Sequence, residues 1–189
     1  MPKKKPEKKT CRICGETKPI TKFEKDKRVI GQRTSRCQSC KYRSQDRATY
    51  AYRKLHERAK AEPGRKVEVT LAQVKALFSA YDGRCAYCNA EEEEHGPRFH
   101  LEHIVSRFAG GRDHISNLTI SCPTCNSKKG TKPVVDYFYA KEQFQDDNFA
   151  QLAHYVAFTS GQPVSEVLRE MVDAHIEQCR RNIERGQSS

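Results

Sequence analysis

The sequence predicts an α+β protein made of small modules that zinc holds together, and three observations lead to this prediction. Eight of the nine cysteines form Cys-x-x-Cys pairs, a spacing that suits tetrahedral zinc better than a disulfide network. Hydrophobic residues make up only 36% of the 189 residues, and Trp is absent. A single large core is therefore not expected. The four pairs are Cys11/Cys14, Cys37/Cys40, Cys85/Cys88 and Cys122/Cys125.

Charge is spread unevenly along the chain. Residues 1–68 carry 22 Lys and Arg against 8 Asp and Glu, whereas residues 69–132 carry 8 against 7. Residues 133–189 are acidic, with 5 basic residues against 9 acidic ones. A basic excess confined to one third of the chain is typical of a protein that binds a polyanion. A solvated tail that only aids solubility is the alternative, but the distribution favours nucleic acid as the partner.

The cellular setting follows from the cysteines and from two missing signals. The sequence contains no signal peptide and no apolar run of membrane length. Together with the metal-type cysteine spacing, this predicts a reducing, intracellular location, in the cytoplasm of a bacterium or of a phage-infected host cell, and no membrane partner. Cys179 lies outside the pairs and is expected to be a buried thiol on a helix face.

Residues 1–10 form a run of Lys and Pro that is expected to be a disordered basic tail. Such a run can contact phosphates or resemble a nuclear import signal. We favour a flexible tail with mild, non-specific attraction to DNA.

Residues 11–40 read CRIC, then 22 residues, then CQSC, which predicts a four-cysteine zinc ribbon. Phe23, Val29 and Ile30 around Gly31 are expected to form a short β-hairpin. Four thiolates on zinc contribute on the order of 10–16 kcal/mol of apparent binding free energy, which would offset the lack of a core. The ribbon is either a spacer or a DNA-docking module. Basic residues near the cysteines favour docking, namely Arg12, Arg33, Arg36, Lys41 and Arg43.

Residues 41–68 are expected to form a basic linker, helical over 41–62, because no Gly or Pro occurs before Pro63. Its apolar face is thin and its surface is crowded with basic side chains such as Arg47. A helix of this kind bridges modules or lies along a charged partner, and we expect it to follow the DNA backbone.

A better-defined helix is predicted over residues 70–83. Thr70 and Gln73 have the spacing of a capping box, and Asp82-Gly83 ends the pattern. This helix leads the chain to Cys85.

The stretch from Cys85 to Gly130 predicts a second four-thiolate zinc site, since it reads CAYC, then 33 residues, then CPTC. Residues 98–104 and 118–121 are expected to be strands that flank a Gly-Gly loop, and residues 123–129 a short helix. Polar residues that a purely structural zinc knuckle does not need lie within this stretch, namely Glu102, His103, Asn117 and Asn126.

The motifs CAYC, LEHIVSR, GG and SNLTISCPTCNSKKG occur in this order over about residues 71–132. Together they resemble the HNH, or ββα-metal, endonuclease family, of the zinc-stapled kind common in phage and bacterial proteins. The N-terminal CRICGETKPITKF and CQSC resemble the zinc ribbon that sometimes precedes such domains. The resemblance implies a divalent-metal-dependent endonuclease that hydrolyses phosphodiester bonds of double-stranded DNA.

The resemblance also implies roles for single residues. His103 is expected to be the general base that takes a proton from the attacking water. Glu102 and Asn126 are expected to bind one catalytic Mg²⁺ or Mn²⁺, in addition to two structural Zn²⁺, and Asn117 to brace the loop. Basic side chains are expected to hold flanking phosphates, namely Arg107, Arg112, Lys128 and Lys129.

One departure from the family pattern keeps alternatives open. The family usually has Asp before the histidine, whereas Glu102 adds a methylene that affects metal geometry, metal preference or rate. A catalytically weak DNA-binding adaptor on an HNH scaffold is one alternative, and an RNA-cleaving nuclease is another. Homing, restriction, packaging and recombination roles all stay open.

Residues 133–189 are expected to form a small acidic helical domain. Helices are predicted within 134–144, from Asp147 or Asn148 to about Thr159, and from Pro163 or Val164 to Arg185. The simpler expectation is that this helical domain packs on the expected nuclease domain. A face for a protein partner or for self-association is the alternative.

Overall fold

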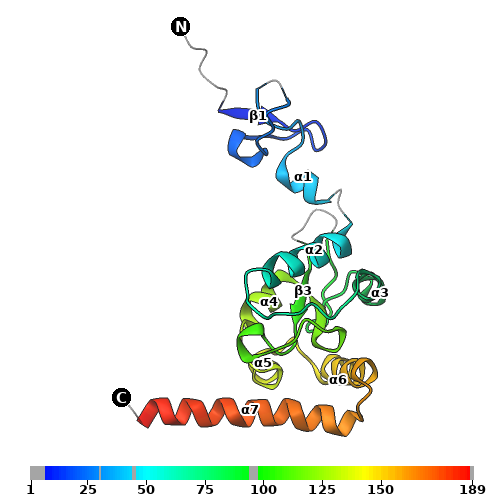
Figure 1. Ribbon diagram of the computed structural model, residues 1–189, viewed down its shortest axis with the longest axis vertical. Helices are drawn as coiled ribbons and strands as arrows, with labels where there is room; N and C mark the ends of the chain where they lie inside the picture. Colours follow the sequence, from blue (N-terminus) through cyan, green and yellow to red (C-terminus); the bar gives the residue numbers. More distant parts are fainter. Residues whose placement is uncertain (1–6, 30, 44–45, 94–97, 188–189) are drawn as a thin grey trace. The chain divides into compact units, whose positions relative to one another are not determined.

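The structure is a computed structural model that describes residues 7–29, 31–43, 46–93 and 98–187 (Figure 1). The chain divides into two compact units, Met1–Tyr50 and Ala51–Ser189. Both contain a small antiparallel sheet and helices, so the predicted α+β class is confirmed. No helix in the described part of the chain is long and apolar enough to cross a membrane.

The first unit begins with a two-stranded antiparallel sheet. β1 (Lys8–Thr10) pairs with β2 (Thr17–Pro19), and the turn between them carries the first two cysteines. The expected tail is therefore corrected at its C-terminal end, because residues 8–10 form backbone hydrogen bonds within a sheet. Residues 1–6 lie outside the described residues.

The rest of the first unit carries its second cysteine pair, Cys37 and Cys40. It contains the 3-10 turn η1 (Ile20–Lys22) and the helix α1 (Gln38–Arg43). The hairpin expected around Gly31 is reduced to one antiparallel bridge between Lys25 and Arg33. Ile30, which we expected in that hairpin, lies outside the described residues.

The predicted linker helix is replaced by two helices, α1 and α2 (Arg47–Ala59). From Ala51 onward α2 belongs to the second unit, where Leu55 and Ala59 are buried. On the exposed surface of α2, Lys54 forms an ion pair with Glu57. A thin apolar face thus anchors an otherwise polar helix.

Helix α3 (Leu71–Tyr81) begins with the predicted capping box. The Thr70 side chain accepts a hydrogen bond from the Gln73 backbone, and the Gln73 side chain accepts one from the Thr70 backbone. Val74 and Leu77 are buried, so the apolar side of α3 is part of the core.

The centre of the second unit has the predicted order of strand, loop, strand and helix. β3 (His100–His103) pairs antiparallel with β4 (Leu118–Ser121), so that His103 lies opposite Leu118. The connecting loop contains the 3-10 turns η2 (Arg107–Ala109) and η3 (Ile115–Asn117). Helix α4 (Pro123–Lys129) follows β4, contacts β3 and ends at Gly130.

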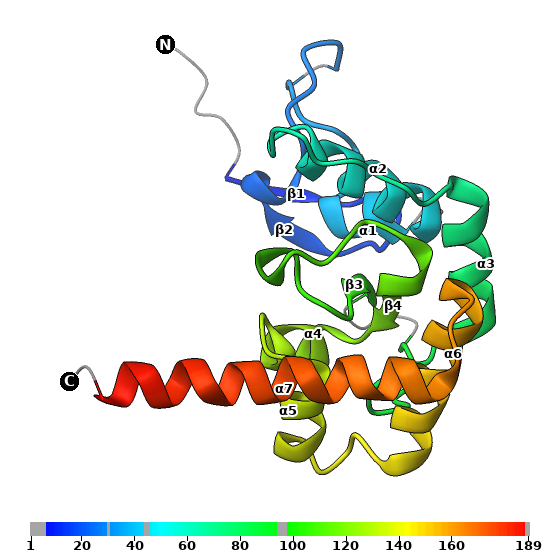
Figure 2. The same cartoon turned by 60° about the horizontal axis from the view of Figure 1, so that its bottom comes forward.

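Three further helices complete the second unit, namely α5 (Val134–Ala140), α6 (Asp146–Ser160) and α7 (Val164–Gln187). Helix α6 contacts η3, and α7 packs against α5 and α6 (Figures 1 and 2). Tyr137 and Phe144 pack with Tyr87, which lies between two zinc-type cysteines, at centroid distances of 5.4 and 5.1 Å from Tyr87. The C-terminal helices therefore share a core with the rest of the second unit. Cys179 is exposed on α7, which corrects the expectation of a buried thiol.

Candidate active site

The cysteine pairs form two separate clusters, as their spacing predicts. Within each cluster one sulfur atom per cysteine lies within 4.8 Å of all the others. In the second cluster, Cys88 Sγ and Cys122 Sγ are 3.9 Å apart. Tetrahedral zinc with bonds of about 2.3 Å to sulfur separates its ligands by about this distance. Both donor sets therefore fit zinc, consisting of Cys11, Cys14, Cys37 and Cys40 in the first cluster and Cys85, Cys88, Cys122 and Cys125 in the second.

Hydrogen bonds to sulfur favour the thiolate form that zinc requires. The Cys122 backbone N–H lies 3.3 Å from Cys85 Sγ, and the Cys125 N–H lies 3.4 Å from Cys122 Sγ. A hydrogen bond with Cys125 and backbone N–H groups outweigh the effect of burial and lower the pKa of Cys85 to about 5. In the first cluster, the Cys37 N–H lies 3.2 Å from Cys11 Sγ.

The second cluster fixes the start of α4. Cys122 is the N-cap of α4, and Cys125 lies in its first turn. Asn126 is therefore one residue beyond a buried zinc-type ligand, on a helix that contacts β3. The cluster thus determines where Asn126 and Lys129 meet the strand.

Glu102 is buried at the centre of β3 and is held by α4. Lys129 Nζ donates hydrogen bonds to Glu102 Oε1 at 3.0 Å and to the backbone oxygen of His103 at 2.9 Å. Burial raises the pKa of Glu102, although the charge of Lys129 and its hydrogen bond oppose this effect. Lys129 is fully buried, so its expected contact with phosphate is corrected. Its ammonium group instead neutralises Glu102.

Asn126 contacts a histidine that the sequence did not single out. Asn126 Nδ2 lies 2.7 Å from His100 Nδ1. His100 and Glu102 are two residues apart in β3, so they point to the same face of the strand, toward α4. Burial, and then the charge of Arg58, lower the pKa of His100. This face therefore groups His100, Glu102, Asn126 and Lys129.

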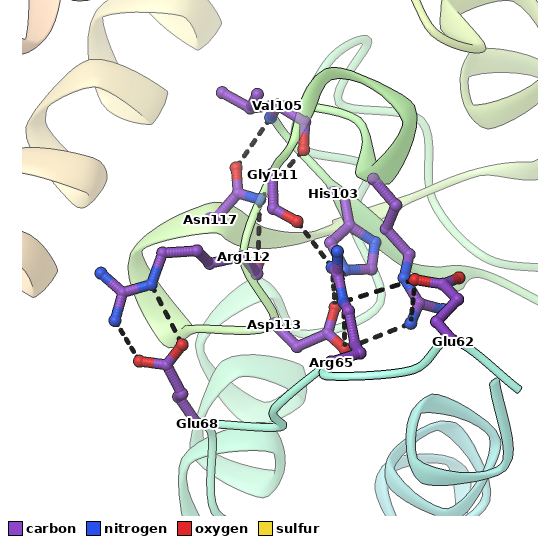
Figure 3. A network of polar contacts seen from close by, with 10 residues as sticks. Glu62, Arg65, Glu68, His103, Val105, Gly111, Arg112, Asp113 and Asn117 are labelled. Atoms are coloured by element: carbon purple, nitrogen blue, oxygen red, sulfur yellow. Dashed lines mark hydrogen bonds and ion pairs between the residues drawn. The ribbon is translucent and has the colours of Figure 1, made fainter. Parts of the chain in front are cut away.

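His103 points to the opposite face of β3 and contacts the loop (Figure 3). Its Nε2 lies 2.7 Å from Asp113 Oδ1, and Asp113 is fully buried. Burial tends to raise the pKa of Asp113, but hydrogen bonds from Arg65 and His103 lower it, so the carboxylate is ionised and accepts. Burial lowers the pKa of His103 despite Asp113. A neutral ring that donates from Nε2 keeps a lone pair on Nδ1.

Arg65 holds the same Asp113 carboxylate that contacts His103 (Figure 3). The guanidinium donates from Nη2 to Asp113 Oδ1 at 2.5 Å and from Nε to Oδ2 at 3.1 Å. A third bond of 2.6 Å joins Arg65 Nη2 to the backbone oxygen of Gly111. Bidentate pairing of this kind fixes the carboxylate in one orientation.

Asn117 connects the two ends of the loop (Figure 3). Its Oδ1 accepts a hydrogen bond from Val105 N at 2.7 Å, and its Nδ2 donates to Val105 O and Arg112 O, both at 3.0 Å. A Cβ at Gly111 would lie 1.8 Å from Val105 O, so only glycine fits there. These contacts tie the loop together, and the role expected of Asn117 in the site stays a prediction.

The expected phosphate contacts of the second unit differ in exposure. Arg107 is largely buried and pairs with Glu62 and Asp113, at 3.3 and 3.4 Å. Arg112 is exposed but forms an ion pair with Glu68, and Lys128 is exposed on α4. Of the expected contacts in this unit, Arg112 and Lys128 are thus the accessible ones.

The basic residues expected to dock DNA in the first unit lie around its cluster. Arg12 and Arg36 are exposed, and Lys41 forms an ion pair of 2.6 Å with Glu24. Arg33 Nη1 donates to the backbone oxygen of Phe23 at 2.7 Å, so part of its hydrogen-bonding capacity is structural. Arg47 is half-buried at the start of α2, and the side chain of Arg43 lies outside the described residues.

The structure brings the expected catalytic residues onto neighbouring elements but holds each with a different partner. In the described part of the chain, no bond between side chains joins Glu102, His103 and Asn126 to one another. Their convergence on one cation therefore stays a prediction. Sequence reasoning missed Asp113 and Arg65, which are 48 residues apart, and only the fold reveals their contact.

Comparison with known proteins agrees with this geometry. The family model described as HNH endonuclease matches residues 85–132, which run from the first cysteine of the second cluster to just beyond α4. No curated protein matches the chain. The match covers the two strands, the braced loop, the short helix and all four cysteines of the cluster. Over residues 85–132 the chain is therefore similar to HNH endonucleases.

Proposed function

We propose that this protein is a divalent-metal-dependent endonuclease that hydrolyses phosphodiester bonds of double-stranded DNA. One observation carries the proposal. The zinc-type cluster fixes the start of α4, and α4 and the strand β3 that it contacts carry a histidine, a carboxylate and an amide within the segment that matches HNH endonucleases. A site with a base and hard oxygen ligands suits hydrolysis of a phosphodiester.

His103 serves as the general base in this proposal. Its Nε2 is engaged by Asp113, so the proton acceptor is Nδ1. Asp113 fixes the ring orientation and stabilises the imidazolium that forms when His103 takes a proton from water. Because Arg65 holds Asp113 through two hydrogen bonds, the orientation of His103 depends on the loop as a whole.

Glu102 and Asn126 would hold one Mg²⁺ or Mn²⁺. A carboxylate and an amide oxygen are hard donors, and the bond of Asn126 to His100 uses the amide nitrogen, which leaves the oxygen for a ligand. When bound, the cation supplies positive charge that stabilises the transition state and the leaving oxygen. Lys129 keeps Glu102 oriented in the buried strand.

The proposed substrate follows from the charge distribution. The basic excess lies in residues 1–68, and the exposed Arg12 and Arg36 flank the first cysteine cluster. Lys128 and Arg112 add exposed positive charge on the second unit. Lys and Arg at such positions contact phosphates and set affinity rather than sequence choice. We therefore assign the first unit to DNA docking.

Substitution His103→Ala tests the proposal directly. The variant should lose about 10²- to 10⁴-fold of divalent-dependent nicking of supercoiled DNA, the usual contribution of a general base. Zinc content and DNA affinity should be unchanged. His154→Ala is the matched control, because His154 is an exposed histidine on α6. Equal activity of His103→Ala and the parent protein contradicts the assigned role.

A second candidate function is a DNA-binding adaptor on the same scaffold. The observation that favours it is the buried ammonium of Lys129 beside Glu102, which supplies the positive charge that a metal ion would otherwise bring. In that case the parent protein binds DNA but does not nick it in Mg²⁺ or Mn²⁺. A parallel digest of RNA separates both candidates from an RNA-cleaving nuclease.

A further inference from the structure

Helix α7 carries an apolar stripe that faces solvent. Leu168, Val172, Ile176 and Ile183 are 37%, 45%, 41% and 59% exposed. Cys179, between the last two, is exposed as well. Without Cys179, the stripe holds four of the ten large hydrophobic residues that are exposed in the described part of the chain. A concentration of this kind on one helix is typical of an interaction surface.

The spacing of the stripe is that of a coiled-coil seam. The five residues follow one another at intervals of 4, 4, 3 and 4. Intervals of 3 and 4 keep side chains on one narrow face of a helix, which suits knobs-into-holes packing against a second helix. At a rise of about 1.5 Å per residue, the seam is roughly 22 Å long.

The stripe is separate from the face that packs inside the protein. Val167 and Met171 are buried against the second unit, and His175 contacts Asp136 of α5. Successive residues turn by about 100° around a helix, so Val172 lies next to the packed face rather than on it. Within the described residues, the stripe therefore stays exposed.

Charged residues border the stripe on its other side. Asp173 and Arg180 are seven residues apart, so both lie along the same edge. Neither side chain forms a hydrogen bond or an ion pair in the described part of the chain. Arg169 and Glu184 continue this edge in the two directions. The order along the edge is thus basic, acidic, basic, acidic.

When a second copy of α7 runs in the opposite direction, each charge along this edge faces a charge of opposite sign. Two antiparallel copies of α7 place Asp173 opposite Arg180 of the partner subunit, and Arg169 opposite Glu184 of the partner subunit. The same register sets Ile176 against Cys179 of the partner subunit, and Val172 against Ile183 of the partner subunit. In a parallel pair the charged edge of one helix faces the opposite edge of the other, so Asp173 does not meet Arg180 of the partner subunit.

The shape of α7 within its unit agrees with such a pairing. Its C-terminal end projects past α5, while its first half lies on α5 and α6 (Figures 1 and 2). An antiparallel pair sets each projecting end against the first half of the other helix.

We propose that this chain forms a twofold-symmetric dimer through antiparallel pairing of α7, with a seam of Val172, Ile176, Cys179 and Ile183 and with Asp173 paired to Arg180 of the partner subunit. The proposal concerns assembly alone and does not depend on DNA cleavage. A failure of the nuclease proposal leaves it standing, and the reverse also holds.

The test measures the mass of the full zinc-loaded chain without DNA by sedimentation equilibrium over a range of concentrations. The parent protein should be a dimer that dissociates on dilution. Val172→Asp combined with Ile176→Asp should give a monomer with unchanged helix content by circular dichroism. Phe158→Asp is the matched control, because Phe158 is 87% exposed on α6 outside the stripe and should leave the dimer intact.

Charge exchange tests the orientation of the pair. Asp173→Arg alone should weaken the dimer about tenfold, because two attractive contacts per dimer become repulsive. Arg180→Asp alone should do the same, and the two together should restore the parent dissociation constant. A parent protein that is monomeric throughout, a dimer that survives the double Asp substitution in the seam, or a charge exchange that restores nothing overturns the proposal.

Discussion

The two cysteine clusters use the same ligands but surround them differently. The first cluster packs with Phe23 in a small core that is otherwise made of its own cysteines. The second lies beside a ring cluster that includes Tyr87, Tyr137 and Phe144. All six buried polar or charged residues of the described part fall in the segment that this second cluster clamps, namely Glu102, Ser106, Asp113, Thr119, Ser121 and Lys129.

Burying a charged group lowers stability unless the group is paired. The gathering of buried charged groups in the second module therefore needs an explanation. The first cluster stabilises a small module, and the basic side chains of that module need only to be exposed to solvent. The second holds a carboxylate, an ammonium and a histidine at fixed positions within the protein. Buried ionisable groups at perturbed pKa values gather at functional sites. The comparison therefore supports the proposal that the second module carries the chemistry and the first docks DNA.

The largest expected effect comes from removing one zinc ligand from each cluster in turn. Cys125→Ser should abolish cleavage and unfold β3, β4 and α4, because zinc binding supplies folding free energy to such modules. Cys37→Ser should remove one zinc equivalent and weaken DNA binding, but the second unit should stay folded. Both cysteines are fully buried, which makes the two variants a matched pair.

Zinc content by atomic absorption, helix content by circular dichroism and nicking at saturating DNA distinguish the two variants. If Cys37→Ser abolishes cleavage as completely as Cys125→Ser does, the division of roles between the modules is wrong.

A smaller effect is expected when the buried ion pair of the second module is broken. Lys129→Met leaves Glu102 uncompensated and should lower the free energy of unfolding by about 3–5 kcal/mol. Lys128→Met is the control, since Lys128 is exposed on the same helix and should change stability by less than about 0.5 kcal/mol. Chemical denaturation in the presence of excess zinc measures both. Equal stability of the two variants would show that the pair is not part of the folded core.

The elements of the second module could be predicted from sequence because their signals are local. The capping box at Thr70, the strand Leu118–Ser121 and the helix Pro123–Lys129 each depend on residues close together in the chain, and all three are present in the structure. The division of the predicted linker into α1 and α2 had no comparable Gly or Pro signal.

The partners of the site residues could not be predicted, because they come from distant parts of the chain. Lys129 looked like a surface residue in a run of lysines, yet it reaches Glu102 across 27 positions. Asp113 follows the Gly-Gly pair in a loop whose course no periodicity specifies, and its contact with His103 depends on that course. The types and order of the residues are thus enough to predict the module. The pairing of its charged side chains can be known only from the folded structure.

The smallest expected effect concerns Asp113, which is fully buried. Asp113→Asn keeps the size of the side chain but removes the charge that orients His103 and receives Arg65. The rate of cleavage at saturating DNA should fall about tenfold, equivalent to ~1.4 kcal/mol in the barrier, while the KM should stay within about twofold. Glu62→Gln is the control, because Glu62 pairs with Arg65 and Arg107 in the same network but does not contact His103. A rise in KM with an unchanged maximal rate would mean that Asp113 only supports the loop against DNA, and the buried charge of the second module would then be structural at this position.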